Sequence, residues 1–306
     1  MNININTLSS LFKANKKEVQ IYCGKLLKKK IKFKYLKENE KKIVFLNIIK
    51  KVLVDKQKIG AKTRKKIWFN GWNESLNLIR KKKDNTYLPK YLTASKNNFF
   101  RLDGKIIKAK QDFEIKMMDI YRHWYLKKYL KNVDNIYEFG AGTGHNLIAI
   151  SKIYPKKQLY GSDFVRSSVN ILKTISNKKN LNLKPFLFDM EKPNKKIKLK
   201  ENSAVYTSGA LEQLSSRIES FIDFTLKNKP KIVIHSEPVV DFYNINNSLD
   251  LLGKTWHLKR GYTSNLYSIL SYLHKKKKIK IIKTLKSPFG GLMMEGYSLI
   301  IWKPFK

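Results

Sequence analysis

The stretch from residue 135 to residue 146 constrains the fold of this chain more than any other. Residues 136–139 are an apolar run that predicts a buried strand, and three glycines follow at alternate positions, Gly140, Gly142 and Gly144. An apolar, helix-compatible run then begins at Leu147. Glycine suits such a turn because the backbone bends sharply and a ligand can approach it closely. A strand, glycine turn and helix of this kind is typical of the first unit of a nucleotide-binding α/β sheet.

Acidic residues follow the predicted strands in a regular way. Seven strands are expected, at residues 136–139, 158–163, 183–188, 203–207, 231–235, 278–282 and 298–302. The chain has only 23 acidic residues, yet each of the first five strands has one at or just beyond its C-terminal end: Glu138, Asp163, Asp189, Glu212 and Glu237. Open α/β sheets bind ligands outside those strand ends. The pattern therefore predicts a ligand site at that edge of the sheet.

The glycine spacing separates two families of nucleotide-binding proteins. The dinucleotide fingerprint places its third glycine three positions after the second, where this chain has His145. An acidic residue followed by GxGxG, here Glu138 to Gly144, instead resembles the first motif of the class I S-adenosylmethionine-dependent methyltransferases. The resemblance covers roughly residue 112 to the C-terminus. It implies an α/β fold with a seven-stranded, mostly parallel, doubly wound sheet whose last strand is antiparallel.

The same resemblance implies a cofactor, S-adenosyl-L-methionine, and the residues that hold it. In that family the acid after the second strand binds the ribose, which maps to Asp163. The acid after the third strand lies by the adenine, which maps to Asp189. The full set that the resemblance implies is Glu138, Phe139, Gly140, Gly142, Gly144, Asp163, Phe164, Asp189, Met190 and Ser208.

Two regions are expected, a helical, lysine-rich N-terminal region at 1–110 and a methyltransferase domain at 111–306 with an insertion at about 239–275. Asp112 is expected to cap a helix that packs on the sheet through Phe113, Met117, Ile120, Tyr121 and Trp124. Trp68 and Trp72 lie in the N-terminal region. They are either a core anchor to the sheet domain or an aromatic wall over the substrate.

The net charge of +41 does not by itself predict a nucleic-acid partner. Only seven of the 64 basic residues are Arg, and Lys, Asn and Ile, all abundant here, share A/T-rich codons. Phosphate-binding surfaces tend to favour Arg, whose planar fork matches the anion. Nucleic acid is therefore a second choice of partner, and peripheral contact with anionic lipid stays open. The single Cys23 excludes an internal disulfide and a cysteine metal site. No signal peptide or long apolar run is evident, so a cytoplasmic protein is expected.

Methyl transfer to a hydroxyl needs an aligned acceptor, a dry site and a base. His235 and Glu237 alternate onto one face of their strand, and His145 begins a helix, whose N-terminus keeps an imidazole neutral. These three residues are the candidate bases. The insertion is expected to fold over the ends of the fourth and fifth strands, and three of its residues should face the acceptor pocket: His257, Arg260 and Tyr262.

Three functions fit the sequence. The first is methylation of a hydroxyl on a small molecule or glycan. The second is methylation of the ribose or base of rRNA or tRNA. Against base methylation, residues 207–210 read Thr-Ser-Gly-Ala where amino-methylating enzymes have an Asn/Asp-Pro-Pro-aromatic tetrapeptide. The third is a non-catalytic, basic RNA- or membrane-binding protein that keeps the scaffold, since a fold alone does not fix a function.

Overall fold

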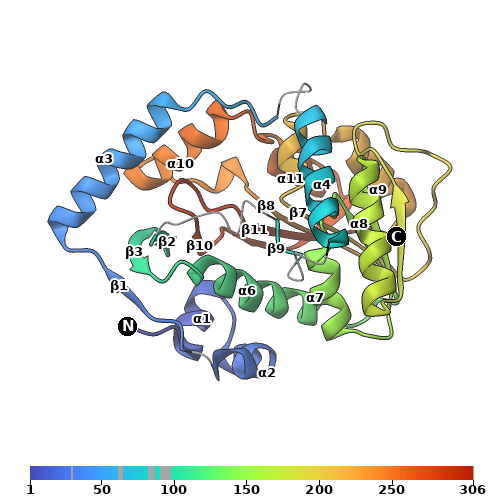
Figure 1. The fold of residues 1–306 in the computed structure, drawn as a ribbon, viewed down its shortest axis with the longest axis horizontal. Coiled ribbons are helices and arrows are strands. Elements are labelled where there is room, and N and C mark those ends of the chain that lie inside the picture. The colour runs from blue at the N-terminus through green and yellow to red at the C-terminus, as the bar shows by residue number, and fades with distance from the viewer. Residues whose placement is uncertain (29, 61–64, 82–86, 90–97, 306) are drawn as a thin grey trace.

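A seven-stranded sheet forms the centre of the computed structural model, which describes residues 1–28, 30–60, 65–81, 87–89 and 98–305 (Figure 1). Its strands are β4 (Asn135–Phe139), β5 (Gln158–Asp163), β6 (Leu183–Leu187), β7 (Ser203–Ser208), β8 (Ile232–Glu237), β9 (Ile279–Leu285) and β11 (Ser298–Pro304). The order is β6-β5-β4-β7-β8-β11-β9, and only β11 runs antiparallel to its neighbours. The predicted fold class is confirmed.

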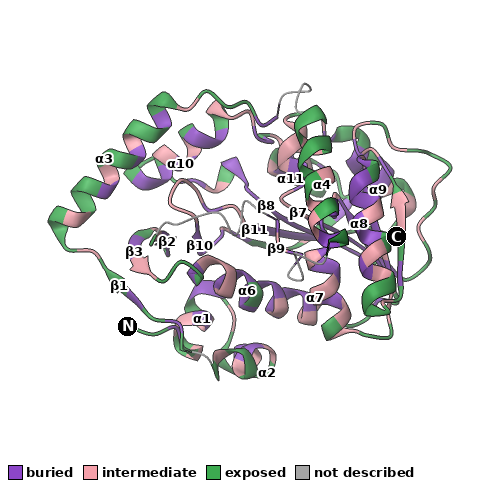
Figure 2. Cartoon of the chain, in the orientation of Figure 1, coloured by how far each residue is buried: buried purple, intermediate pink, exposed green. Residues whose placement is uncertain are grey.

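Helices cover both faces of this sheet, which explains why its central strands are apolar on both sides. Along β7, Ala204 and Tyr206 face a core with α6 (Phe113–Tyr129), α7 (His145–Ile153) and α8 (Arg166–Lys179). Val205 faces the opposite core, with α9 (Glu219–Asn228) and α11 (Leu266–Lys275). Figure 2 shows the buried strands between these layers.

Helix α6 packs on the sheet as predicted, and the five apolar residues expected on its inner face are all buried. Its start differs from the prediction in one detail. Asp112 is the N-cap residue, but its side chain makes no capping hydrogen bond and instead lies 2.6 Å from the Lys116 ammonium. The Asp112 carboxylate therefore pairs with a side chain one helical turn along and does not cap the helix.

The N-terminal region contains α1 (Ile5–Phe12), α2 (Lys16–Cys23), a 3₁₀ turn η1 (Gly24–Lys28), α3 (Glu38–Val54) and α4 (Lys65–Arg80). It also contributes three strands to a second, antiparallel sheet that the sequence did not predict. The order of that sheet is β1 (Phe33–Tyr35), β3 (Lys105–Ala109), β2 (Phe99–Leu102) and β10 (Phe289–Gly290). Because β10 comes from the C-terminal part of the chain, this sheet joins the two expected regions. One core cluster likewise runs from Ile3 to Ile301, and the division at residue 110 stays a prediction.

The insertion forms a 3₁₀ turn, η4 (Val240–Phe242), then α10 (Ser248–Lys259) and α11. Leu249 and Trp256 of α10 share a core cluster with three residues of α3, so these two helices lie side by side at one end of the molecule (Figure 1). Across the described ranges, no helix combines the length and apolarity needed to cross a membrane.

Candidate active site

The ends of the parallel strands bring the predicted acids to one edge of the sheet. Asp163 is the last residue of β5, Glu237 is the last residue of β8, and Glu138 is the fourth residue of β4. Neighbouring strands are in register here, with Glu138 opposite Gly161 and Ser208 opposite Ser236. The carboxylates therefore converge on the loops that follow β4 and β7.

The three glycines of the turn after β4 serve different contacts. Gly140 and Gly142 have φ of +71° and +53°, a region that side chains rarely adopt. A methyl group added at Gly140 would lie 2.4 Å from the Ala210 side chain, so glycine allows the ends of β4 and β7 to approach. A methyl at Gly144 would lie 2.5 Å from Ile175 of α8. Gly144 also has a positive φ, +74°, so all three glycines shape the turn, and the third in addition permits helix packing.

Glu138 is the most unusual side chain at this edge. It is 1% exposed, and its Oε1 accepts a hydrogen bond of 2.7 Å from Asn146, whose own oxygen accepts one of 2.7 Å from Arg122. Its Oε2 is buried and has no hydrogen-bond partner in the part of the chain that the structure describes. Burial raises the pKa of Glu138 to about 8, against the opposing effects of Asn146 and Arg122. An unpaired buried oxygen is costly, and a cationic ligand would satisfy it.

Asp163 fixes the glycine loop to the end of β5. Its Oδ2 accepts a hydrogen bond of 3.0 Å from the Gly142 amide, and its Oδ1 accepts one of 3.1 Å from the Val165 amide. Burial raises the pKa of Asp163 to about 6, although these amides oppose the shift. Each carboxylate oxygen can accept more than one hydrogen bond, so Asp163 keeps capacity for ligand hydroxyls.

The acid expected by the adenine has a partner that the sequence did not indicate. The Lys65 ammonium lies 3.0 Å from Asp189 Oδ2 and 5.5 Å from the centroid of the Phe164 ring. Met190 is buried, and its methyl lies 3.4 Å from the position of a methyl added at Gly140. Phe164, Asp189 and Met190 therefore do lie near one another, with a lysine from α4 beside them.

Trp72 also comes to this edge from α4. A methyl added at Gly142 would lie 2.9 Å from the Trp72 indole, so the ring packs directly on the glycine loop. Trp68 stacks on Trp72 with their ring centroids 5.7 Å apart. Helix α4 lies along α8 (Figure 1). The contacts of Trp72 with Gly142 and of Trp68 with Trp72 place both indoles beside the loop. Neither tryptophan is fully buried, and two buried residues one turn further on, Leu76 and Ile79, are the anchors of α4.

Two residues of the predicted cofactor set lie differently from the others. The Phe139 side chain is fully buried in an aromatic cluster, with ring centroids 4.8 Å from Phe188 and 5.0 Å from Phe221. Only the backbone of residue 139 is thus available at the loop. Ser208 is half-buried at the end of β7, and its hydroxyl interacts with Tyr206, whose own hydroxyl lies 2.8 Å from that of Tyr125.

The candidate bases on β8 occupy very different surroundings. His235 is fully buried, its Nδ1 lies 2.9 Å from the Thr207 hydroxyl, and burial lowers its pKa to about 3. Its neighbour Trp302 lies on the α11 face of the sheet, with a centroid distance of 6.2 Å. The Glu237 carboxylate instead accepts hydrogen bonds of 3.1 and 3.2 Å from the Ala210 and Leu211 amides. Burial raises its pKa to about 7.

His145, the third candidate base, is separate from the other two. It begins α7, on the α6 side of the sheet. Burial, assisted by the charge of Arg122, lowers its pKa to about 3. The imidazole is therefore neutral, as expected for this position. The structure does not bring it to the α11 face where His235 lies.

The residue of the insertion that contacts the loop after β7 is not one of the three that were expected to face the pocket. Arg260 is wrongly predicted to face the pocket, because its guanidinium pairs with Asp55 at 2.9 and 3.0 Å and stacks on Trp256. His257 is buried, and its Nε2 lies 2.8 Å from the carbonyl oxygen of Thr263. Tyr262 belongs to the core cluster shared with α3. Thr263 makes the contact with the loop after β7, donating from its amide to the Glu212 carbonyl at 3.2 Å.

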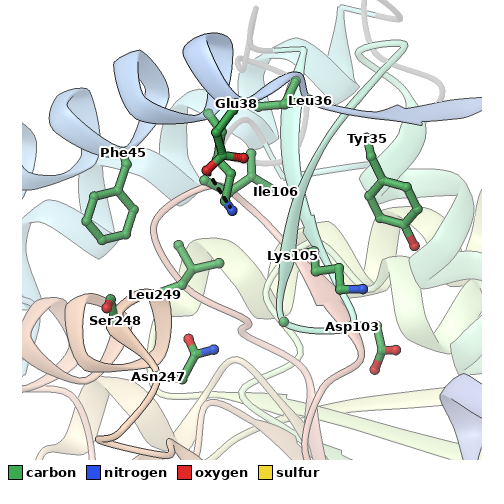
Figure 3. A pocket seen from close by; sticks show the side chains of 12 residues that line it. Tyr35, Leu36, Glu38, Phe45, Asp103, Lys105, Ile106, Asn247, Ser248 and Leu249 are labelled. Atoms are coloured by element: carbon green, nitrogen blue, oxygen red, sulfur yellow. Dashed lines mark ion pairs between the residues drawn. The ribbon is translucent and has the colours of Figure 1, made fainter.

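A cavity of about 610 Å³ lies elsewhere, between α3, the β2–β3 turn and the N-terminus of α10 (Figure 3). None of its lining residues belongs to the predicted site, and its charges have both signs, including a Glu38–Lys41 pair at 3.5 Å. In the described ranges no group of three or more His, Cys, Asp or Glu residues is arranged to hold a metal ion.

Comparison with known proteins finds no matching family model and no matching curated protein. Solved structures do match. A SAM-dependent methyltransferase from Aquifex aeolicus is 14% identical, with 60% of this chain and 89% of that chain covered and a TM-score of 0.42. The 16S rRNA methylase ArmA is 15% identical, with 76% and 98% covered and a TM-score of 0.45. Geranyl diphosphate C-methyltransferase from Streptomyces coelicolor A3(2) is 8% identical, with 63% and 84% covered and a TM-score of 0.44.

These similarities assign no substrate, since one match is an rRNA methylase and another a geranyl diphosphate methyltransferase. The order and directions of the strands carry the assignment of the fold. The chain has a class I methyltransferase-like fold, with a seven-stranded sheet in which one strand is antiparallel.

Proposed function

We propose that this protein is an S-adenosylmethionine-dependent methyltransferase. The observation that carries the proposal is the buried Glu138 oxygen without a described partner, beside the glycine loop. The cofactor has an ammonium group and a sulfonium, and both cations suit an edge of the sheet lined with carboxylates in an otherwise basic chain.

The chain's own residues divide the work of holding the cofactor. The Glu138 carboxylate would accept hydrogen bonds from the cofactor's ammonium group, and the Asp163 carboxylate from its ribose hydroxyls. Asp189 would lie beside the adenine. The bound cofactor supplies a methyl group on a positively charged sulfur. Glu138 and Asp163 are only 1% and 4% exposed, so water is largely excluded from the carboxylates that set the geometry.

We assign a hydroxyl of a small molecule or glycan as the acceptor. Glu237 supports this assignment, because a base works best when its pKa lies near the working pH, and the pKa of Glu237 is raised to about 7. Three backbone amides of the loop after β7, those of Ala210, Leu211 and Glu212, donate to the carboxylate and fix its direction. The Glu237 carboxylate would take the hydroxyl proton as the acceptor oxygen attacks.

The first experiment measures cofactor binding by titration calorimetry with S-adenosylhomocysteine. Binding by the wild-type protein, with no binding of NAD, is the expected result. Methyl transfer is then followed from labelled S-adenosylmethionine to a panel of hydroxylated small molecules and glycans. A folded wild-type protein that fails to bind S-adenosylhomocysteine would contradict the proposed activity.

Methylation of rRNA or tRNA is the second candidate, and the net charge of +41 favours it. If the lysines act only as a diffuse charge, RNA binding should be weak, indifferent to sequence and steeply reduced by salt, since counterion release dominates such binding. Tight, sequence-selective binding that persists at physiological salt would instead rank RNA first.

A further inference from the structure

Helix α3 carries a second apolar face that the described chain leaves exposed. Its first apolar face, Val44, Ile48 and Val52, packs on α10. Four of its other apolar residues are between 62% and 71% exposed: Ile43, Leu46, Leu53 and Val54. The remaining two, Phe45 and Ile49, are half-buried. Figure 2 shows α3 at the periphery of the molecule. A helix that is apolar on two sides is normally buried, so an exposed one indicates a partner.

The exposed apolar residues form one stripe. At about 100° per residue they fall within an arc of about 100° on the helix. Lys50 lies inside that arc and Lys42 borders it, and both are exposed. The two acidic residues of α3, Glu38 and Glu40, lie outside the arc. Apart from the uncharged Asn39, which also lies inside the arc, the stripe is therefore aliphatic and basic.

We propose that α3 binds an anionic lipid surface through this stripe. A helix with an aliphatic face and flanking lysines can lie at the boundary between lipid headgroups and acyl chains. There the aliphatic side chains leave water while the ammonium groups contact lipid phosphates. The chain's net charge of +41 attracts it to such a surface.

The other occupants fit the stripe less well. A second copy of the chain would bring two surfaces of the same positive charge together, which opposes association. Single-stranded RNA is bound by stacking bases on aromatic rings, whereas the four exposed side chains are aliphatic. Anionic lipid is the surface that matches both the aliphatic residues and the lysines.

Residues at the C-terminal end of α10 hold the C-terminal end of α3, which carries the stripe, in place. The Lys259 ammonium donates to the Val52 carbonyl at 2.7 Å, and Arg260 pairs with Asp55, the residue that follows α3. These contacts, with the buried face of α3, attach the helix to the body of the protein. The aliphatic face is therefore presented without a folding step, which lowers the entropic cost of binding.

The test is co-sedimentation with vesicles of phosphatidylcholine alone and with about one third phosphatidylserine. Wild-type protein should sediment with the second kind only. The triple variant Ile43→Ser, Leu46→Ser and Leu53→Ser should lose at least about tenfold in partition coefficient, a change of about 1.4 kcal/mol. Tyr272→Ser removes an equally exposed side chain from α11 and should bind like wild type.

Two further arms separate insertion from simple charge attraction. At about 1 M salt the Debye length falls to about 3 Å, so residual binding reports the aliphatic contribution. The wild type should keep more of its binding than the triple variant under that condition. Lys42→Glu with Lys50→Glu retains the aliphatic residues and should also lose binding to anionic vesicles. Circular dichroism establishes that each variant is folded.

Three results would overturn the proposal. Wild-type protein could stay in the supernatant with anionic vesicles. The folded triple variant could bind as tightly as wild type at both salt concentrations, which would leave the lysines alone as the cause. Sedimentation velocity could instead detect a wild-type dimer that the triple variant loses, which would make the stripe an interface between copies. None of these results depends on methyltransferase activity.

Discussion

Replacing Glu138 with Gln should stabilise the free protein and at the same time weaken its binding of S-adenosylhomocysteine. The substitution keeps the shape of the side chain and an oxygen that can accept from Asn146. It removes the ability of this side chain, which is 1% exposed, to ionise. Opposite effects on stability and affinity are the expected signature of a charge kept for a ligand rather than for the fold.

The size of the stability effect follows from the pKa of Glu138, which burial raises from 4.5 to about 8. At pH 7 the unfolded chain must take up a proton at this residue when it folds. The gap of about 2.5 pH units between the ordinary pKa and pH 7 corresponds to about 3 kcal/mol. Because the folded pKa is the higher one, the contribution of Glu138 is fully present below about pH 4.5 and is lost as the pH rises toward 8.

The free energy of unfolding is measured by denaturant titration at about pH 4 and pH 7. Glu138→Gln should match wild type at the lower pH and exceed it by up to about 3 kcal/mol at the higher pH. Titration calorimetry should show affinity for S-adenosylhomocysteine reduced by about tenfold to a hundredfold, since a hydrogen bond to a charged group contributes about 1.5–3 kcal/mol.

Glu114→Gln is the matched control. Burial also raises the pKa of the Glu114 carboxyl, which accepts from the Tyr297 hydroxyl at 3.2 Å and lies beside Gly291. The stability of this variant relative to the wild type should increase as the pH rises, but the variant should bind S-adenosylhomocysteine like the wild type. The reasoning on Glu138 is refuted if Glu138→Gln loses stability at pH 7, or if its affinity for S-adenosylhomocysteine is unchanged.

Three other predictions concern the same edge of the sheet. Asp163→Asn should weaken S-adenosylhomocysteine binding by about tenfold or more in calorimetry, through the ribose and through the Gly142 amide; wild-type affinity would remove Asp163 from the site. S-adenosylhomocysteine should change the tryptophan fluorescence of the wild type much more than that of Trp72→Phe. The control variant Phe69→Ala, at an exposed position on α4, should respond like the wild type. Equal responses of all three proteins would place the ligand away from Trp72. Glu237→Gln should lower turnover by about 10²–10⁴ with cofactor affinity nearly intact, whereas His235→Ala should lower it less than about tenfold; the reverse order would move the base to His235.

The sequence was sufficient for the sheet and for the acids along its edge. Strands β4, β7 and β8 are segments of five or six residues that are almost entirely buried on both faces, so local composition is enough to predict them. Parallel strands end at the same edge, and a carboxylate that follows a strand in sequence is therefore near the others in space. Asp163 and Glu237 could therefore be placed at this edge without knowing the conformation of the loops.

The second sheet could not be predicted in the same way. Its β2–β3 hairpin did leave a signal, since Asp103 and Gly104 have φ of +50° and +71°, and an Asp-Gly pair favours such turns. Strand β10 has two residues and pairs with β2 across 187 positions of sequence, with Phe289 opposite Leu102. A strand that short has no periodicity, and only the folded chain brings it to its partner.

Helix α4 shows why the contact between Trp72 and the glycine loop could not be predicted from the sequence. The spacing of its apolar residues indicates that α4 has a face, but not which surface that face meets. In the structure Leu76 and Ile79 are buried and provide the anchor, while Trp72, four residues before Leu76, packs on Gly142. The anchor of α4 is therefore aliphatic, and the interpretation of the tryptophans as a wall over the substrate stays a prediction. The Lys65–Asp189 pair spans 124 positions and depends on that same docking. Its existence follows from where Leu76 and Ile79 hold the helix, which no local pattern specifies.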